Sequence, residues 1–197
     1  MRNNLSLSAL SEFANEIREA PEEADISYGV SLAWETGTRS AVQVKPMKVG
    51  PHKVSRSFSW KVDEPRQLLG GNHGPNPQEL MLSGLGACIM VAFVVGATTK
   101  GIQIDSLEID VEGDLDLNGF LGLGDTNGTS NGSSGIVGFP QIKYDLKVMA
   151  DAPSDVLEEI HQQAVAHSPN AMTIANPVAL NGSLIIETGD AGAENDE

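Results

Sequence analysis

Cys88 is the only cysteine of this 197-residue chain and the side chain best suited to chemistry. One thiol cannot form an intrachain disulfide, so Cys88 is a free thiol, a metal ligand or the partner of a thiol in another molecule. The thiolate is the nucleophile, and burial among apolar groups raises the pKa of a thiol. A reactive Cys88 therefore needs a cation close by, which the fold has to bring. The alternative is a small buried hydrophobic residue without chemistry.

The histidines and acidic residues do not form a pattern for metal binding. The histidines lack the short spacing of metal ligands, and we expect them to lie at the surface or to be satisfied by hydrogen bonds: His52, His73, His161 and His167. The acidic residues between Asp105 and Asp116 follow strand periodicity, which indicates a solvated face rather than a calcium site. We therefore expect neither a metal nor another cofactor.

Composition and charge narrow the class of protein. The net charge of −15 argues against a nucleic-acid partner. A chain of this length fits one domain that can bury a core without disulfides. A lone thiol in an apolar segment fits a reducing cytosol, and the first residues lack the apolar region of a secretory signal. We therefore expect a cytoplasmic protein.

Cys88 lies in the most apolar stretch of the chain, residues 76–100, whose only charges are Glu79 and Lys100. A stretch this long suits a membrane span or a helix buried on all sides of a protein core. Its many small residues, the absence of flanking Lys and Arg clusters or bordering aromatic residues, and the alternating segments after it favour the buried helix and no membrane. Some of the small residues lie four apart and share a helix face, as Ser83 and Ala87 do. Such a face fits either ordinary packing in a core or contact with the same helix of a second chain.

The other segments predict the elements that surround this helix. Residues 5–19 have helical apolar spacing and belong to an N-terminal extension, 1–25. Alternation predicts strands at 26–35, 39–44, 54–62, 102–117, 142–149 and 178–187. A second helix is expected at 155–166, followed by a connector at 171–177. Strands in runs, separated by helices, indicate an α+β fold over residues 26–187.

Two segments have the composition of irregular structure. Residues 118–138 are rich in Gly, Ser and Asn, which predicts a flexible loop inserted in the domain. Residues 188–197 are acidic and lack large apolar side chains, which predicts a disordered tail.

Two motifs resemble those of the OsmC/Ohr family of organic hydroperoxide resistance proteins. The first is Gly74-Pro75-Asn76-Pro77-Gln78-Glu79-Leu80 followed by Gly84-Leu85-Gly86-Ala87-Cys88, and the second is His167-Ser168-Pro169. The order of elements also agrees, from about residue 27 to 187. The resemblance implies antiparallel sheets wrapped around a buried central helix, in an intertwined homodimer. It also implies a peroxidase that reduces organic hydroperoxides with a cysteine, which an arginine and a glutamate activate and a second cysteine resolves.

The family's site residues map onto this chain only in part. Cys88 matches the peroxidatic cysteine, and Arg39 matches the activating arginine to within a residue or two, with Arg56 as second choice. Gln78 stands where the family has glutamate, and Ser168 where it has the second cysteine. A guanidinium stays charged and offers a rigid set of donors, and the amide oxygen of Gln78 can accept a hydrogen bond from it.

The spacing of Gln78 and Cys88 constrains any joint site. Ten residues span about 15 Å along a straight helix, so the two side chains cannot meet within one unbroken helix. Either the helix breaks near Gly84 and Gly86, or the site combines Cys88 of one chain with Arg39 and Gln78 of another.

Two functions follow from these residues. The first is a one-cysteine peroxidase of organic hydroperoxides that relies on an external thiol reductant, since the sulfenic acid has no second cysteine to meet. The second is a dimer without peroxidase activity that binds a small hydrophobic ligand in its interface cleft. Cys88 and Arg39 favour the first, whereas Gln78 and Ser168 favour the second.

Overall fold

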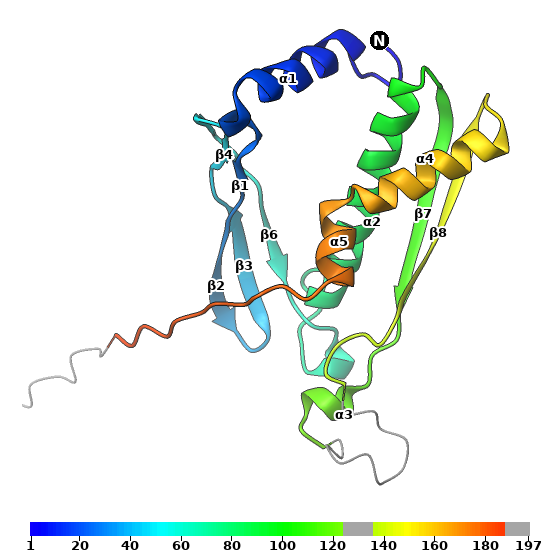
Figure 1. Ribbon diagram of the computed structural model, residues 1–197. Coiled ribbons are helices and arrows are strands. Elements are labelled where there is room, and N and C mark those ends of the chain that lie inside the picture. Colours follow the sequence, from blue (N-terminus) through cyan, green and yellow to red (C-terminus); the bar gives the residue numbers. More distant parts are fainter. Residues whose placement is uncertain (124–135, 188–197) are drawn as a thin grey trace, which may run out of the picture.

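The computed structural model describes residues 1–123 and 136–187 of the chain. Most of the predicted loop insertion and the predicted tail, 188–197, lie outside these residues. The order is α1 (Leu7–Glu19), β1 (Ile26–Ser27), β2 (Val30–Thr36), β3 (Arg39–Val44), β4 (Met47–Val49), β5 (His52–Val54), β6 (Ser59–Val62), α2 (Pro77–Thr99), β7 (Ile104–Gly113), α3 (Leu117–Phe120), β8 (Ile142–Ala150), α4 (Ser154–Ala166) and α5 (Pro169–Ala175) (Figure 1). Two short 3-10 turns, Pro21–Ala24 and Arg66–Leu68, lie between them.

The long helix α2 begins and ends where its sequence predicts. Asn76 caps it by accepting a hydrogen bond from the backbone N–H of Glu79, while the Glu79 carboxylate accepts one from the N–H of Asn76. Pro77 follows at the first helical position, where its missing N–H has no helical partner to lose. Gly101, at φ +73°, ends the helix in the left-handed conformation that glycine adopts most easily.

The strands form three antiparallel sheets, β1-β4-β5, β2-β3-β6 and β7-β8. In the β7-β8 ribbon the apolar residues pair across the strands, as Leu107 does with Val148 and Ile109 with Leu146. The acidic residues of β7 point to the other, exposed face, where Lys147 contacts Asp110 at 2.9 Å. The predicted solvated face of this strand is therefore confirmed.

The core lies between α2, the ribbon β7-β8 and the helices α4 and α5. Buried side chains of α2 and α4 meet in one cluster, which includes Phe93 and Ile160. A second cluster joins α2 to α5 and contains Leu85, Ile89 and Ala171. Among the described residues, α2 is the one helix long and apolar enough to cross a membrane. One side of α2 packs against β7, α4 and α5.

The other side of α2 is uncovered in the single chain. The α+β class, with antiparallel sheets and a long central helix, is confirmed. Burial on all sides is wrong for one chain, because Val91 is 64% exposed. The sheet β2-β3-β6 stands apart from α2 (Figure 1). Leu32 is 60% and Trp34 75% exposed on it.

Local predictions were wrong at five places. The strand predicted over 26–35 is two strands, β1 and β2, which belong to different sheets. The connector 171–177 is mostly the helix α5, because Ser168 and Pro169 start a new helix as well as ending α4. The segment predicted as a final strand, 178–187, is not a strand, since no described strand pairs with it. The strand predicted to reach residue 117 ends at Gly113, and the short helix α3 follows it, capped by Asp116. The strand predicted over 54–62 is two separate strands, β5 and β6.

The N-terminal extension is attached at its beginning to the end of α2. The side-chain amide of Asn3 donates to the Thr98 hydroxyl and to the Ile102 carbonyl, each at 2.9 Å, and its oxygen accepts from the N–H of Ile104 at 2.8 Å. Residues 7–19 form the predicted helix, α1, which has no buried residue.

Candidate active site

Cys88 lies half-buried on α2, at a cleft between α2 and α4. The cleft has a volume of about 330 Å³. Its lining is mostly apolar and comes from both helices and the start of α5: Cys88, Val91, Ala92, Val95, Gly96, Ile160, Gln163, Ala164, His167 and Pro169. A small apolar molecule could therefore reach the thiol through this cleft.

His167 is the residue of this site that the sequence analysis missed. It ends α4 and lines the same cleft as Cys88. His167 follows Ile160 by seven residues and Ala164 by three, so the three residues lie along one face of α4. This spacing is the sequence signal that could have identified it. His161 instead bonds the hydroxyl of Tyr144 at 2.7 Å, and burial raises the pKa of that tyrosine. The expectation of a histidine satisfied by hydrogen bonding is thus confirmed for His161.

Ser168 has a structural role that does not depend on a thiol. Its side chain is fully buried and accepts a hydrogen bond from the backbone N–H of Ala171 at 3.2 Å, which caps α5. It does not line the cleft of Cys88, although its neighbours His167 and Pro169 do.

Arg39 lies on β3 and does not line the Cys88 cleft. Its Nε lies 3.0 Å from a carboxylate oxygen of Glu35, and Lys61 pairs with the other oxygen. These two cations, led by the Lys61 hydrogen bond, lower the pKa of Glu35. Arg56, the second choice, lies over the ring of Phe58 at 4.9 Å. No Arg or Lys side chain from residues 1–123 and 136–187 lines the Cys88 cleft.

Gln78 lies in the first turn of α2, and α2 continues without a break from Pro77 to Thr99. The helix therefore holds Gln78 and Cys88 about 15 Å apart along its axis within one chain. A break near Gly84 and Gly86 is ruled out. Gly86 instead lets α2 approach β7 closely, because a Cβ there would lie 3.0 Å from a methyl carbon of Val111.

Asp63, which sequence reasoning did not single out, connects the hairpin of Arg39 to the loop before α2. Its carboxylate is 2% exposed and accepts a hydrogen bond from the Thr38 hydroxyl at 2.7 Å. It also accepts from the backbone N–H groups of Gly71 and His73, and the Nδ1 of His73 lies 2.8 Å from it. The bonds from Thr38 and His73 hold the pKa of Asp63 well below its ordinary range.

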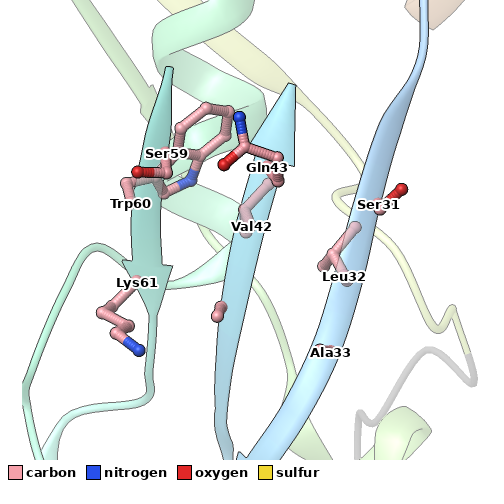
Figure 2. Close-up of a pocket in the computed structure, with 9 residues that line it drawn as sticks. Ser31, Leu32, Ala33, Val42, Gln43, Ser59, Trp60 and Lys61 are labelled. Atoms are coloured by element: carbon pink, nitrogen blue, oxygen red, sulfur yellow. The ribbon is translucent and has the colours of Figure 1, made fainter. Parts of the chain in front are cut away.

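A second concavity lies on the sheet β2-β3-β6 and contains no thiol. It has a volume of about 490 Å³ and a largely apolar face. Figure 2 shows Leu32, Val42 and Trp60 on three neighbouring strands of this sheet. These residues face one another in register, since Leu32 pairs with Val42 and Val42 with Trp60. The hollow is therefore an uncovered apolar sheet face rather than a reactive site.

The family model described as "OsmC-like protein" matches residues 70–182. This segment contains Cys88, the cleft and both helices that form it. The chain belongs to the OsmC-like family. A comparison with curated proteins found no match.

Solved OsmC-like structures have the same fold. The chain is similar to an OsmC-like protein from Mycoplasma pneumoniae, with a TM-score of 0.56 and 19% identity over 76% of this chain and 87% of the other. It is also similar to an OsmC-like protein of unknown function from Vibrio cholerae, with a TM-score of 0.56 and 12% identity over 75% and 92% of the chains. A putative osmotic stress induced and detoxification response protein from Psychrobacter arcticus has a TM-score of 0.54 and 10% identity over 73% and 85%. At these identities the similarity shows the fold alone.

Proposed function

We propose that this OsmC-like protein is a thiol-dependent peroxidase of organic hydroperoxides, with Cys88 as its nucleophile. The observation that carries the proposal is that the only thiol of the chain lies at an apolar cleft of about 330 Å³. A cleft with this lining suits a hydroperoxide with an apolar organic group. The family to which the chain belongs includes hydroperoxide-resistance peroxidases.

The reaction is a one-cysteine cycle. The Cys88 thiolate attacks the terminal oxygen of the hydroperoxide, the O–O bond breaks, and an S–O bond forms. The sulfur is oxidised to sulfenic acid and the hydroperoxide is reduced to an alcohol. An external thiol then condenses with the sulfenic acid and releases water, and a second external thiol reduces the mixed disulfide. A reducing cytoplasm would supply such thiols.

We further propose that the working form is a homodimer in which Arg39 and Gln78 of one chain approach Cys88 of the other. The unbroken α2 supports this arrangement, because it keeps Gln78 away from Cys88 of the same chain. Two uncovered apolar surfaces also support it: the side of α2 that carries Val91 and the sheet face that carries Leu32. A second chain placed over both would bury them.

Ligand binding without chemistry is the second candidate function. It is favoured by the absence of any Arg or Lys side chain from the cleft lining among the described residues. In this case the cleft binds a small hydrophobic molecule, and Cys88 serves as part of an apolar wall.

The two functions differ in what Cys88→Ser does to hydroperoxide consumption. We expect the wild-type protein to consume cumene hydroperoxide in the presence of dithiothreitol, and Cys88→Ser to reduce the rate to that of dithiothreitol alone. Equal rates for both proteins would contradict the peroxidase and support the binding function. Thr99→Ser, an equally small change at an exposed position of the same helix outside the cleft lining, is the matched control and should retain the activity.

A further inference from the structure

Cys88 and His167 line the same cleft, and two contacts hold α4 and α5 along α2 at this place. A Cβ atom at Gly96 would lie 3.1 Å from the Cγ2 of Ile160. Farther along, the side-chain amide of Asn170 donates to the Gly84 carbonyl at 2.8 Å. On α2, Cys88 lies between Gly84 and Gly96. On the other side of the cleft, His167 lies between Ile160 and Asn170.

The backbone at His167 is held on both sides. Ala164, one turn before it on the same face of α4, is buried against α2. Ser168, directly after it, is fully buried and caps α5. The imidazole itself remains exposed at the edge of the cleft. The backbone therefore fixes the position of His167, and its side chain can contact a molecule bound in the cleft.

Among the described residues that line the cleft, Cys88 and His167 are the two with titratable side chains. The other polar side chain is the amide of Gln163, which carries no proton that it can give to an alkoxide at neutral pH. The peroxidase reaction needs two proton transfers at this place. The thiol must lose a proton before it attacks, and the alkoxide released from the O–O bond must gain one.

We propose that His167 performs both transfers as the acid–base residue of Cys88, an inference that rests on the peroxidase proposed above. The imidazole accepts the Cys88 proton, and the thiolate attacks the terminal peroxide oxygen. As the S–O bond forms and the O–O bond breaks, the imidazolium gives this proton to the alkoxide. The products are a sulfenic acid and an alcohol, and His167 returns to its neutral form. Histidine is the residue that most often serves as an acid and base near neutral pH.

The choice of oxidant tests this role. A tert-butyl hydroperoxide releases a strongly basic alkoxide that needs a proton, whereas peracetic acid releases acetate, which does not. We expect His167→Ala to slow single-turnover oxidation of the Cys88 thiol by tert-butyl hydroperoxide about 100-fold, the usual size of an acid–base contribution. Oxidation by peracetic acid should slow about 10-fold or less, because only the loss of the thiol proton is affected. Free imidazole should restore much of the rate, since replacing the imidazole of His167 by a methyl group leaves room for it at the same place.

His161→Ala is the matched control, because His161 lies on the same helix but bonds Tyr144 and does not line the cleft. It should retain wild-type rates with both oxidants and gain nothing from imidazole. If His167→Ala does not fold, His167→Gln takes its place with the same two oxidants.

The outcomes separate the role of His167 from the proposed function. Equal losses with both oxidants, or no loss with either, would overturn the role of His167. Wild-type Cys88 reacting with both oxidants no faster than free glutathione would overturn the peroxidase itself. A larger loss with tert-butyl hydroperoxide together with rescue by imidazole would support both.

Discussion

Gln78 occupies the first turn of α2 as a neutral amide. A carboxylate at this place is favoured by the partial positive charge of the helix N-terminus and would form a charge-assisted hydrogen bond with a guanidinium. In the proposed dimer, this bond would orient the Arg39 of one chain toward Cys88. The amide of Gln78 can accept a weaker hydrogen bond but supplies no negative charge.

We therefore expect Gln78→Glu to raise the second-order rate constant for cumene hydroperoxide about 10-fold, the factor that corresponds to one charge-assisted bond. Stopped-flow oxidation of Cys88 measures it. Gln78→Asn, which keeps an amide, is the control and should give no increase. An unchanged rate in Gln78→Glu would argue against a role of this position in the site.

Ser168 acts as a helix cap, so its removal should affect stability rather than chemistry. We expect Ser168→Ala to lower the free energy of unfolding by about 1 kcal/mol, the usual loss for an N-cap side chain. Urea denaturation followed by circular dichroism measures this change. Hydroperoxide consumption by the folded variant should equal that of the wild type. A loss of activity without a loss of stability would contradict the structural role.

At the scale of elements, one carboxylate holds three segments together. Asp63, at the end of β6, binds the β2–β3 turn through Thr38 and the loop before α2 through Gly71 and His73. Because its folded-state pKa lies below the unfolded-state value, Asp63 stabilises the fold above about pH 4, and this contribution is lost as the pH falls further.

The pH dependence of stability therefore changes when this carboxylate is removed. We expect Asp63→Asn to lower the urea midpoint at pH 7 and to flatten the fall of the midpoint between pH 5 and pH 2. Asp110→Asn removes a carboxylate whose side chain is 64% exposed in an ion pair with Lys147, and it should change little. An unaltered acid profile in Asp63→Asn would show that the bonds of Asp63 do not stabilise the fold.

Local sequence patterns were sufficient for most of the elements. The bounds of α2 follow from Asn76, Pro77 and Gly101, whose capping and turn preferences act within a few residues. The apolar faces of β7 and β8 follow from strict alternation. The segment 178–187 alternates only in part, and a strand also needs a partner strand, which no pattern within the segment supplies.

The candidate site was only partly predictable from the sequence. Cys88 is the only cysteine of the chain, so the sequence alone identifies it as the candidate nucleophile. His167 was missed because its relation to Cys88 depends on how α4 packs along α2, through contacts such as Ile160 with Gly96. Asp63 was missed because its partners are backbone N–H groups as well as side chains, and backbone groups carry no residue signature.

At the scale of the whole molecule, the single chain leaves apolar surface on two elements that do not cover each other. Leu32 and Trp34 are exposed on β2, and Val91 is exposed on α2. Exposed apolar area of this kind marks an interface more often than a free surface. A second copy of the chain is the occupant that the proposed site also requires.

We expect the wild-type protein at micromolar concentration to have twice the chain mass of 20.8 kDa in analytical ultracentrifugation. Leu32→Glu should dissociate it, because a carboxylate would be buried in an apolar interface. Ser106→Glu is the control, because Ser106 is exposed on β7 and lies outside both apolar surfaces. A wild-type monomer, or equal effects of both variants, would contradict the dimer and the shared site.

The central claim is that Cys88 reacts with an organic hydroperoxide, and trapping its sulfenic acid tests this most directly. Wild-type protein is treated with one equivalent of cumene hydroperoxide in the presence of dimedone, and the intact mass and the peptide that contains residue 88 are measured. The account predicts a single dimedone adduct, located on Cys88. Complete consumption of the hydroperoxide with Cys88 unmodified, or no consumption at all, would contradict it.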